Sequence, residues 1–342
     1  MRKLSLEDKL FFFERSFFTL DGLWMIETEE ETNWKITLKI DLAVWKKLLK
    51  IIIRRLKKYL KIETNNLNDL IEILTFRWSI EGWDYELKQN ECDKAEIIIK
   101  KCPYKAAMDR NPERQDKISL ICKDMCIPFY KSSIRDFNTE ITIKRTMYMG
   151  LGDNFCDFNF YLDKSLISEE EKDEPIKPLR RISKEDKLFY FERNFRTLDG
   201  LWVIESENEI GWETALKLDI IVWQRLYKII FRRVKKYLKL EGNSLNDLIE
   251  ILSFVWNCEG NIHEIFQEGE KRAVINITKC PYIEAMERNP DRHHRIESIC
   301  KEMCIPYLEP VIMEFNPKIK YTREKFIGTG DSVCDFILKL EE

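Results

Sequence analysis

The sequence predicts an α+β fold built from two tandem copies of one domain, each with N-terminal helices and a C-terminal antiparallel sheet. Residues 4–162 align with residues 182–340 at a constant offset of 178, without a gap, and about half of the aligned positions are identical. Leu20-Asp-Gly-Leu-Trp24, for example, recurs as Leu198 to Trp202. A copy of about 160 residues can bury a core by itself, which excludes a short-repeat solenoid.

The domain boundaries follow from this repeat. We expect a first repeat domain at 1–163, a charged linker at 164–181 and a second repeat domain at 182–342. The linker contains Ser168 to Pro178, a stretch of acidic residues and prolines that is typical of solvated chain. The two repeats could meet as an intramolecular pseudo-dimer.

Each copy is expected to begin with three helices. Ser5 and Asp8 have the spacing of a capping box, so a helix should start at Ser5 and reach about Glu29. Apolar residues recur at helical spacing in the next two segments, which predicts helices over 38–61 and about 67–78. Helices before strands favour an α+β rather than an alternating α/β fold.

Strands and one further helical region complete each copy. Short runs rich in strand-forming residues predict strands, which in the first copy cover 85–89, 95–100, 141–149 and 155–162. Gly150-Leu-Gly-Asp-Asn154 should turn the last pair into a hairpin, and its glycines either make the turn or let backbone amides approach a ligand. Between the pairs, Asn111-Pro112 predicts a helix start and Pro128 its end.

Composition excludes several classes of protein. With 57 Lys+Arg against 60 Asp+Glu the net charge is −3, so there is no overall basic field and we expect no nucleic-acid partner. No apolar run is long enough to span a membrane, and the N-terminus does not resemble a signal peptide. Basic helices at 46–61 and 224–239 could touch an acidic partner or lipid, but a solvated helix face explains them, and we expect no membrane contact. We therefore expect a cytoplasmic protein with reduced thiols.

Eight of the ten cysteines correspond between the copies: Cys102, Cys122, Cys126 and Cys156 match Cys280, Cys300, Cys304 and Cys334. Cys122 and Cys126 are four residues apart on a predicted helix and should share a face. If the other two thiols converge there, the four could hold zinc or an iron–sulfur cluster. The alternatives are buried packing and a reactive thiol.

A nucleophile, if one exists, is expected at Cys102 and its counterpart Cys280. Cys102 precedes Pro103 at a predicted helix start, where the helix dipole favours a thiolate. Cys126 is instead expected at the end of a helix, where the dipole disfavours negative charge.

Carboxylates are the other candidates, because all three histidines lie in the second copy and shared catalysis cannot use them. Glu14 and Asp21 are seven residues apart within an aromatic run, and rings around a carboxylate would raise its pKa. Their counterparts are Glu192 and Asp199, and a simple salt bridge is the alternative. The glycine hairpin contributes Asp153, which recurs as Asp331.

Several of these motifs resemble a known family. Lys101-Cys-Pro-Tyr-Lys-Ala-Ala-Met108, Ile121-Cys-Lys-Asp-Met-Cys126, Phe137-Asn138 and the Gly-x-Gly-Asp-x-x-Cys-Asp-Phe ending are similar to the L-2-amino-thiazoline-4-carboxylic acid hydrolase-like family. The last motif also resembles the ending of 4-vinyl reductase domains, which are small ligand-binding modules. Many members carry one such domain, so the tandem arrangement is a departure.

The resemblance implies hydrolytic opening of a small sulfur–nitrogen heterocycle, in which water attacks an amidine carbon and a ring heteroatom leaves with a proton. It implies that Asp153 or Glu14 acts as the base, that Arg145 and its counterpart Arg323 anchor the substrate carboxylate, and that Cys102 is a nucleophile or ligand. The competing interpretation is a module that binds a metal or hydrophobic ligand without turnover. Either way the partner is a small molecule.

Overall fold

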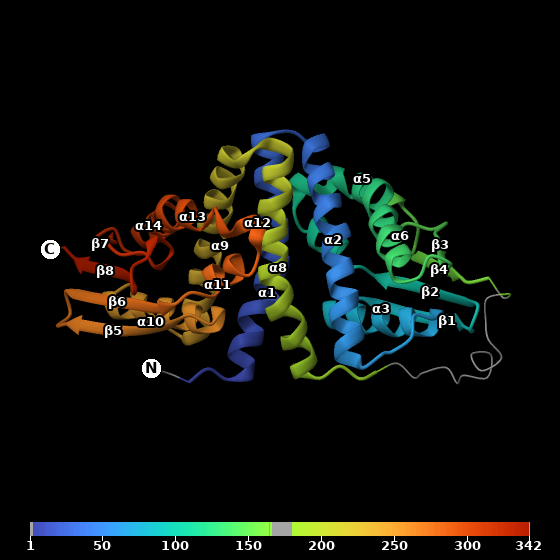
Figure 1. Cartoon of the computed structure of the whole chain (residues 1–342), viewed down its shortest axis with the longest axis horizontal. Coiled ribbons are helices and arrows are strands. Elements are labelled where there is room, and N and C mark those ends of the chain that lie inside the picture. The colour runs from blue at the N-terminus through green and yellow to red at the C-terminus, as the bar shows by residue number, and fades with distance from the viewer. Residues whose placement is uncertain (1–2, 164, 166–179, 342) are drawn as a thin grey trace. The chain divides into compact units, whose positions relative to one another are not determined.

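The expected α+β class is confirmed by the computed structural model, which describes residues 3–163, 165 and 180–341. Long helices are followed by a four-stranded antiparallel sheet, and this arrangement occurs twice (Figure 1). Residues 164 and 166–179, which form most of the expected linker, lie outside the described residues. Within the described ranges, no helix has both the length and the apolar character needed to cross a membrane.

The chain forms two compact units, and each combines parts of both repeats. Unit 1 joins the chain up to Asn33 to the chain from Ser206 onward, and unit 2 runs from Trp34 to Glu205. The first helix of each repeat is therefore built into the unit that holds the rest of the other repeat. The boundaries at 1–163 and 182–342 describe the sequence repeats, whereas the compact units differ from them by this exchange.

Unit 2 contains the first repeat without its first helix. Its elements are α2 (Trp34–Leu60), α3 (Leu67–Glu81), β1 (Asp84–Asn90), β2 (Lys94–Lys101), α4 (Pro103–Asp109), η1 (Pro112–Lys117), α5 (Ile118–Leu120), the π-helix η2 (Ile121–Met125), α6 (Cys126–Phe137), β3 (Thr142–Lys144), η3 (Met149–Leu151), β4 (Cys156–Tyr161) and most of α8 (Lys184–Ile210). The strand order is β1-β2-β4-β3.

Unit 1 repeats this plan with the first helix of the chain. Its elements are α1 (Leu6–Glu31), α9 (Trp212–Leu238), α10 (Leu245–Glu259), β5 (Ile262–Glu268), β6 (Arg272–Lys279), α11 (Pro281–Glu287), α12 (Pro290–His293), α13 (Ile296–Glu302), α14 (Cys304–Phe315), β7 (Ile319–Thr322), η5 (Ile327–Thr329) and β8 (Cys334–Leu340). The strand order is β5-β6-β8-β7, with Ile277 opposite Cys334.

Local sequence signals place the helix starts. The expected capping box is present: Asp8 N donates to Ser5 Oγ at 3.1 Å, and Ser5 N donates to Asp8 Oδ2 at 2.8 Å. The same pair of bonds joins Ser183 and Asp186 at the start of α8. These bonds satisfy amide groups that have no partner within the helix, which fixes where α1 and α8 begin.

Equivalent contacts hold the exchanged helices in both units. In unit 2 the Tyr59 hydroxyl donates to Asp186 Oδ1 at 2.7 Å, and the Tyr59 ring stacks on Phe189 at 3.9 Å. In unit 1 the Tyr237 hydroxyl donates to Asp8 Oδ1 at 2.9 Å, and Figure 1 shows the blue α1 beside α9, which carries Tyr237. The capping carboxylate of each exchanged helix thus also binds the helix it packs against.

The core of each unit lies between the third helix and the sheet. In unit 2 the fully buried Trp78 of α3 packs on Phe158 of β4 at 5.1 Å. In unit 1 Trp256 of α10 packs on Phe336 of β8 at 4.5 Å. Each of these phenylalanines lies two residues after a matched cysteine, so the core positions the strand that begins with that thiol.

Candidate functional site

The four matched thiols of each repeat gather in one place. In unit 2, Cys102 is close enough to Cys122 and Cys126 for each charge to influence the pKa of the others, and Cys126 is similarly close to Cys156. In unit 1 the same relations join Cys280, Cys300, Cys304 and Cys334. The fold brings each thiol cluster together, because its four cysteines come from four separate places along the chain.

The glycine hairpin packs directly on a thiol of each cluster. Gly152 adopts a left-handed backbone with φ of 103°, which favours glycine and closes the turn. A Cβ on Gly150 would overlap the Cys122 sulfur, and one on Gly328 would overlap the Cys300 sulfur. The first glycine of the Gly-x-Gly-Asp motif is therefore needed for the close approach of the backbone to the cluster.

An arginine lies against each thiol cluster, Arg145 in unit 2 and Arg323 in unit 1, whereas its role as an anchor for a substrate carboxylate stays a prediction. Arg145 Nη1 donates to Cys126 Sγ at 3.0 Å, and its Nε donates to the Asp157 carbonyl at 3.1 Å. The guanidinium lies over the rings of Tyr148 and Phe158, at 4.3 and 4.6 Å. The guanidinium favours the thiolate form of Cys126, but burial has the larger effect and raises the pKa of this thiol.

Arg323 occupies the same place in unit 1. Its guanidinium lies 4.4 Å from the centroid of Phe326 and 4.3 Å from that of Phe336. The charge of the guanidinium and a hydrogen bond from its N–H donors both lower the pKa of Cys304. Arg323 is only 8% exposed, so these donors are also withheld from solvent.

The protonation preferences correct one sequence expectation. Cys102 is the N-cap residue of α4, as expected, but burial raises its pKa despite hydrogen bonds from backbone amides. Burial also raises the pKa of Cys280 to about 12 and that of Cys122 to about 11. The cost of desolvating the charged form outweighs the stabilisation that the start of a seven-residue helix gives to a negative charge. A thiolate is therefore disfavoured at Cys102 and Cys280.

Cys304 has the opposite preference. A hydrogen bond from the Cys300 thiol and the charge of Arg323 lower its pKa to about 6, against the effect of burial. The Cys300 pKa moves up in the same exchange, because that thiol keeps its proton as the donor. The described residues of unit 1 thus contain a dithiol in which one sulfur favours the thiolate.

The sequence missed this residue because Pro128 was expected to end a helix. Instead α6 continues directly from the π-helix η2, where the amide of Cys126 donates to the Ile121 carbonyl, and it runs through Pro128 to Phe137. In the second repeat, α14 begins at Cys304. Cys126 and Cys304 therefore lie at junctions between consecutive helical segments rather than at the end of a helix.

The hairpin carboxylates stabilise the turn. Asp153 Oδ2 accepts a hydrogen bond from Tyr148 N at 2.6 Å, and Asp331 Oδ2 accepts one from Phe326 N at 2.8 Å. Asp157, which the sequence analysis did not single out, accepts bonds from the amides of Thr146 and Met147. These contacts give Asp153 and Asp331 a structural task, and their action as bases stays a prediction.

The exchange assigns the helix carboxylates to a different compact unit from the thiols of their own repeat. Glu14 and Asp21 lie on α1 in unit 1, whereas Cys102 and Asp153 lie in unit 2. Glu192 and Asp199 lie on α8, in unit 2 with the first-repeat thiols. A constellation of Glu14, Cys102 and Asp153 within one unit is thus not formed.

The thiol clusters do not fit a metal ion as they stand. Over the described ranges, no three His, Cys, Asp or Glu side chains are arranged to hold one. The guanidinium of Arg145 donates to Cys126 Sγ, a bond that uses a ligand electron pair and brings positive charge to the position a cation would need. We derive no chemistry through zinc or an iron–sulfur cluster.

A buried polar network next to the first cluster also escaped the sequence analysis. Arg77 and Glu81 of α3 form an ion pair at 2.9 Å with side chains 1% and 0% exposed, and Arg77 Nη1 donates to the Tyr130 hydroxyl. In the second repeat Val255 replaces the arginine, and Glu259 instead accepts from Tyr227 at 3.0 Å. The sequence feature that could have revealed this network is Arg77 itself, a charged residue within the apolar pattern of α3.

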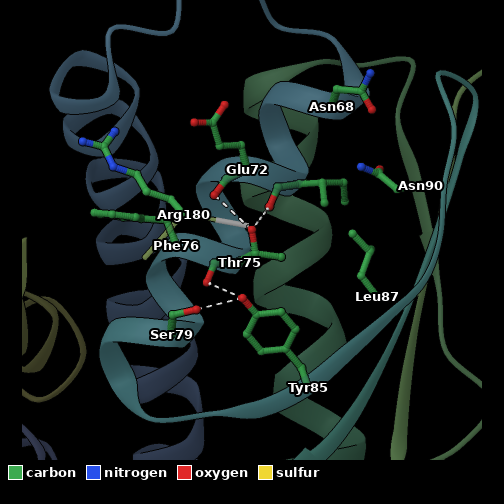
Figure 2. Close-up of a pocket in the computed structure, with 10 residues that line it drawn as sticks. Asn68, Glu72, Thr75, Phe76, Ser79, Tyr85, Leu87, Asn90 and Arg180 are labelled. Carbon is green, nitrogen blue, oxygen red and sulfur yellow. Dashed lines mark hydrogen bonds between the residues drawn. The ribbon is translucent and has the colours of Figure 1, made fainter. Parts of the chain in front are cut away.

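Unit 2 also contains a small pocket between α3 and β1 (Figure 2). Its space of about 20 Å³ is enough for about one water molecule. The oxygens of Asn68 and Asn90 lack hydrogen-bond partners within the described structure, whereas Tyr85 donates to the Thr75 carbonyl at 3.1 Å. A bridging water fits this pocket and a substrate does not, so the thiol clusters remain the candidate site.

Comparison with known proteins adds one match. DUF6125, a family of unknown function, matches residues 180–307, which include α8 to α13 and the start of α14. No curated protein and no solved structure matches the chain. The matched segment contains Cys280, Cys300 and Cys304 but ends before Arg323.

Proposed function

We propose that the thiol cluster of unit 1 is the active site of a hydrolase that opens a small cyclic amidine of the thiazoline-carboxylate type, with the Cys304 sulfur as nucleophile. One observation carries the proposal: Cys304 lies at the start of α14 between the Cys300 thiol and the Arg323 guanidinium. A hydrogen-bond donor and a cation both favour the thiolate, which is the reactive form. The substrate class comes from the family resemblance.

The reaction balances with one water. The Cys304 sulfur adds to the amidine carbon, the bond from that carbon to the ring sulfur breaks, and the departing sulfur takes a proton. Water then attacks the same carbon, and Cys304 leaves as the thiolate. The water oxygen becomes the product carbonyl, and its hydrogens end on the former ring nitrogen and sulfur. A reduced thiol is required throughout, so we place the protein in the cytoplasm.

The test measures turnover of 2-amino-thiazoline-4-carboxylate. Mass spectrometry detects the product, which is heavier than the substrate by one water. Cys304→Ser should lower the rate at least about 100-fold, because the hydroxyl is a far weaker nucleophile at neutral pH. Cys92→Ser is the matched control, since Cys92 has no counterpart in the second repeat and should leave the rate unchanged. Full activity in Cys304→Ser would refute the assignment.

The roles implied by the resemblance need their own variants. Cys102→Ser with Cys280→Ser, and Asp153→Asn with Asp331→Asn, each remove a matched pair. Loss of turnover with an unchanged melting temperature would support the original nucleophile or base. If only the Asp pair lowers stability as well as rate, the hairpin hydrogen bonds explain the effect.

A second candidate is binding without turnover. It is favoured by the apolar side chains beside the unit 1 thiols, where Ile283, Ile296 and Cys300 form a buried cluster with Phe326 and Ile327. Such walls suit a small apolar ligand. A wild-type chain that binds the thiazoline in calorimetry but never adds water to it would favour this candidate.

A further inference from the structure

Two thiols of unit 1 are in direct contact with each other. Cys300 donates a hydrogen bond to the Cys304 sulfur, and this bond moves the pKa values of the two groups in opposite directions. The backbone of Gly328 packs on the Cys300 sulfur and holds it in place, while Cys304 is half-buried. A sulfur that favours the thiolate, touching a second thiol, is the starting arrangement for forming a disulfide.

The other two thiols of this cluster are held by backbone amides. Cys334 Sγ accepts a hydrogen bond from Ile327 N at 3.2 Å, at the start of β8. Cys280 is the N-cap residue of α11, and its sulfur accepts hydrogen bonds from amides of that helix. Cys300 is therefore the thiol placed to react with Cys304.

The chain between the two thiols is a junction of two helices. Residues four apart in one continuous helix have Cβ atoms about 5–6 Å apart, whereas a disulfide needs about 3.5–4.5 Å. Here α13 ends at Glu302, Met303 lies in a turn, and α14 begins at Cys304. Pro306 has no amide hydrogen for the Glu302 carbonyl, so the ladder lacks a bond at this point. A small adjustment of the junction brings the two sulfurs to bonding distance.

The corresponding pair in unit 2, Cys122 and Cys126, provides an internal comparison. The π-helix η2 leads directly into α6, and the amide of Cys126 donates to the Ile121 carbonyl, so helical hydrogen bonding continues between these thiols. Burial raises the pKa of Cys122 to about 11 and also raises that of Cys126. Neither sulfur of this pair favours the thiolate, although the four cysteines of the two pairs match in sequence.

We propose that Cys304 and Cys300 form a redox-active dithiol that reduces a small hydroperoxide and closes to a disulfide. The Cys304 thiolate sulfur attacks one oxygen of hydrogen peroxide, the O–O bond breaks, and the other oxygen leaves and takes a proton to become water. The Cys300 sulfur then attacks the sulfenic sulfur, and its proton leaves with the hydroxyl as a second water. Two electrons pass from the two sulfurs to the peroxide. This reaction goes beyond the proposed hydrolysis and does not rest on it.

The test maps disulfides in the intact chain. The fully reduced protein is mixed with equimolar hydrogen peroxide at pH 7, remaining thiols are blocked with N-ethylmaleimide, and the chain is digested with trypsin without reduction. Cleavage after Lys301 places Cys300 in 296–301 and Cys304 in 302–318, so their disulfide is one distinct linked peptide in mass spectrometry. Cleavage after Lys123 separates the first-repeat pair in the same way.

The peptide linking Cys300 to Cys304 should form at least about tenfold faster than the one linking Cys122 to Cys126, because the thiolate is the form that attacks peroxide. Cys300→Ser keeps a hydrogen-bond donor but removes the second sulfur, so the sulfenic acid at Cys304 should persist and be trapped by dimedone. Cys304→Ser should give neither product. Cys122→Ser is the matched control and should leave the linkage in unit 1 unchanged.

Three results would overturn the dithiol. These are equal rates for the two linked peptides, a disulfide from Cys304 to Cys334 or Cys280 in place of Cys300, or no dimedone adduct in a Cys300→Ser chain with the circular dichroism of the wild type. Hydrolysis is not measured here, so the two proposals fail separately. Disulfide formation without turnover of the thiazoline leaves a redox pair, and turnover without the disulfide leaves a hydrolase with no second reactive thiol.

Discussion

The Tyr190 hydroxyl of α8 donates a hydrogen bond to the Glu81 carboxylate of α3, 109 residues earlier in the chain. The same Oε1 atom accepts from Arg77 Nε at 2.9 Å, and all three side chains are buried. Tyr190 belongs to the second repeat and its two partners to the first. At the matching position of α1 the residue is Phe12, so only the exchanged helix can supply this hydroxyl.

Tyr190→Phe should therefore lower the free energy of unfolding of unit 2 by about 1–3 kcal/mol, since a buried carboxylate loses one donor while the packing is kept. Denaturant titration measures the change. Tyr161→Phe is the control, because Tyr161 is half-buried at the end of β4 and should shift the transition by less than about 0.5 kcal/mol. Equal effects of the two variants would contradict a special role for the Tyr190 bond.

The exchange also predicts which fragment of the chain folds. Residues 34–205 contain all of unit 2 and should unfold in one cooperative transition. Residues 1–163 contain the first sequence repeat but replace Tyr190 with Phe12, which leaves the Arg77–Glu81 pair without its tyrosine. This fragment should be less stable by at least about 1 kcal/mol, by urea titration followed with circular dichroism. Equal stability would show that the exchanged helix is interchangeable.

The thiol chemistry predicts a pH dependence that distinguishes the cysteines. The pKa of Cys304 is lowered to about 6, so its thiolate forms as pH rises through that value. Its alkylation rate by neutral iodoacetamide should rise about tenfold per unit below pH 6 and level off above it. The pKa of Cys122 is raised to about 11, so its rate should still be rising at pH 9. A Cys304 rate that rises steadily to pH 9 would contradict the thiolate.

Local sequence patterns predicted most helices and strands, but they did not predict which first helix packs into which unit. The capping boxes at Ser5 and Ser183 depend on neighbours within a few residues and were found where expected. The glycine turn is present, but the strand before it, expected over 141–149, ends at Lys144. The exchange of α1 and α8 could not be predicted, because the two helices have nearly the same sequence pattern and either one satisfies the local rules. Only long-range contacts such as Tyr190 with Glu81 select one arrangement.

The sequence predicted which residues form the candidate site, but it did not predict which sulfur favours the thiolate. The matched cysteines and Arg145 do lie together, as an internal repeat of rare residue types suggested. The preference for a thiolate at Cys102 took account of the helix start but not of burial, which raises the pKa of this thiol. The rule for the residue before proline also placed Cys126 at a helix end, whereas the π-helix η2 leads directly into α6 and carries the helix through Pro128.

The contact between the glycine hairpin and the thiols can be tested by adding one methyl group. Gly328→Ala would drive its Cβ into the Cys300 sulfur and Ile296, so the variant should lose about 1–3 kcal/mol of unfolding free energy. It should also raise the pKa of Cys304, because displacing Cys300 removes the hydrogen bond that stabilises the thiolate. Denaturant titration and the pH profile of iodoacetamide alkylation measure the two effects.

Two further variants separate this clash from a general intolerance of alanine. Gly22→Ala lies on an open face of α1 and should be neutral or stabilising by up to about 1 kcal/mol, because alanine favours helix. Cys300→Ala removes the sulfur that the new methyl group would meet, so the double variant should lose much less than the sum of the single losses. Simple additivity would mean that Gly328 is needed for the turn itself, and the thiol at position 300 would then have no part in selecting glycine there.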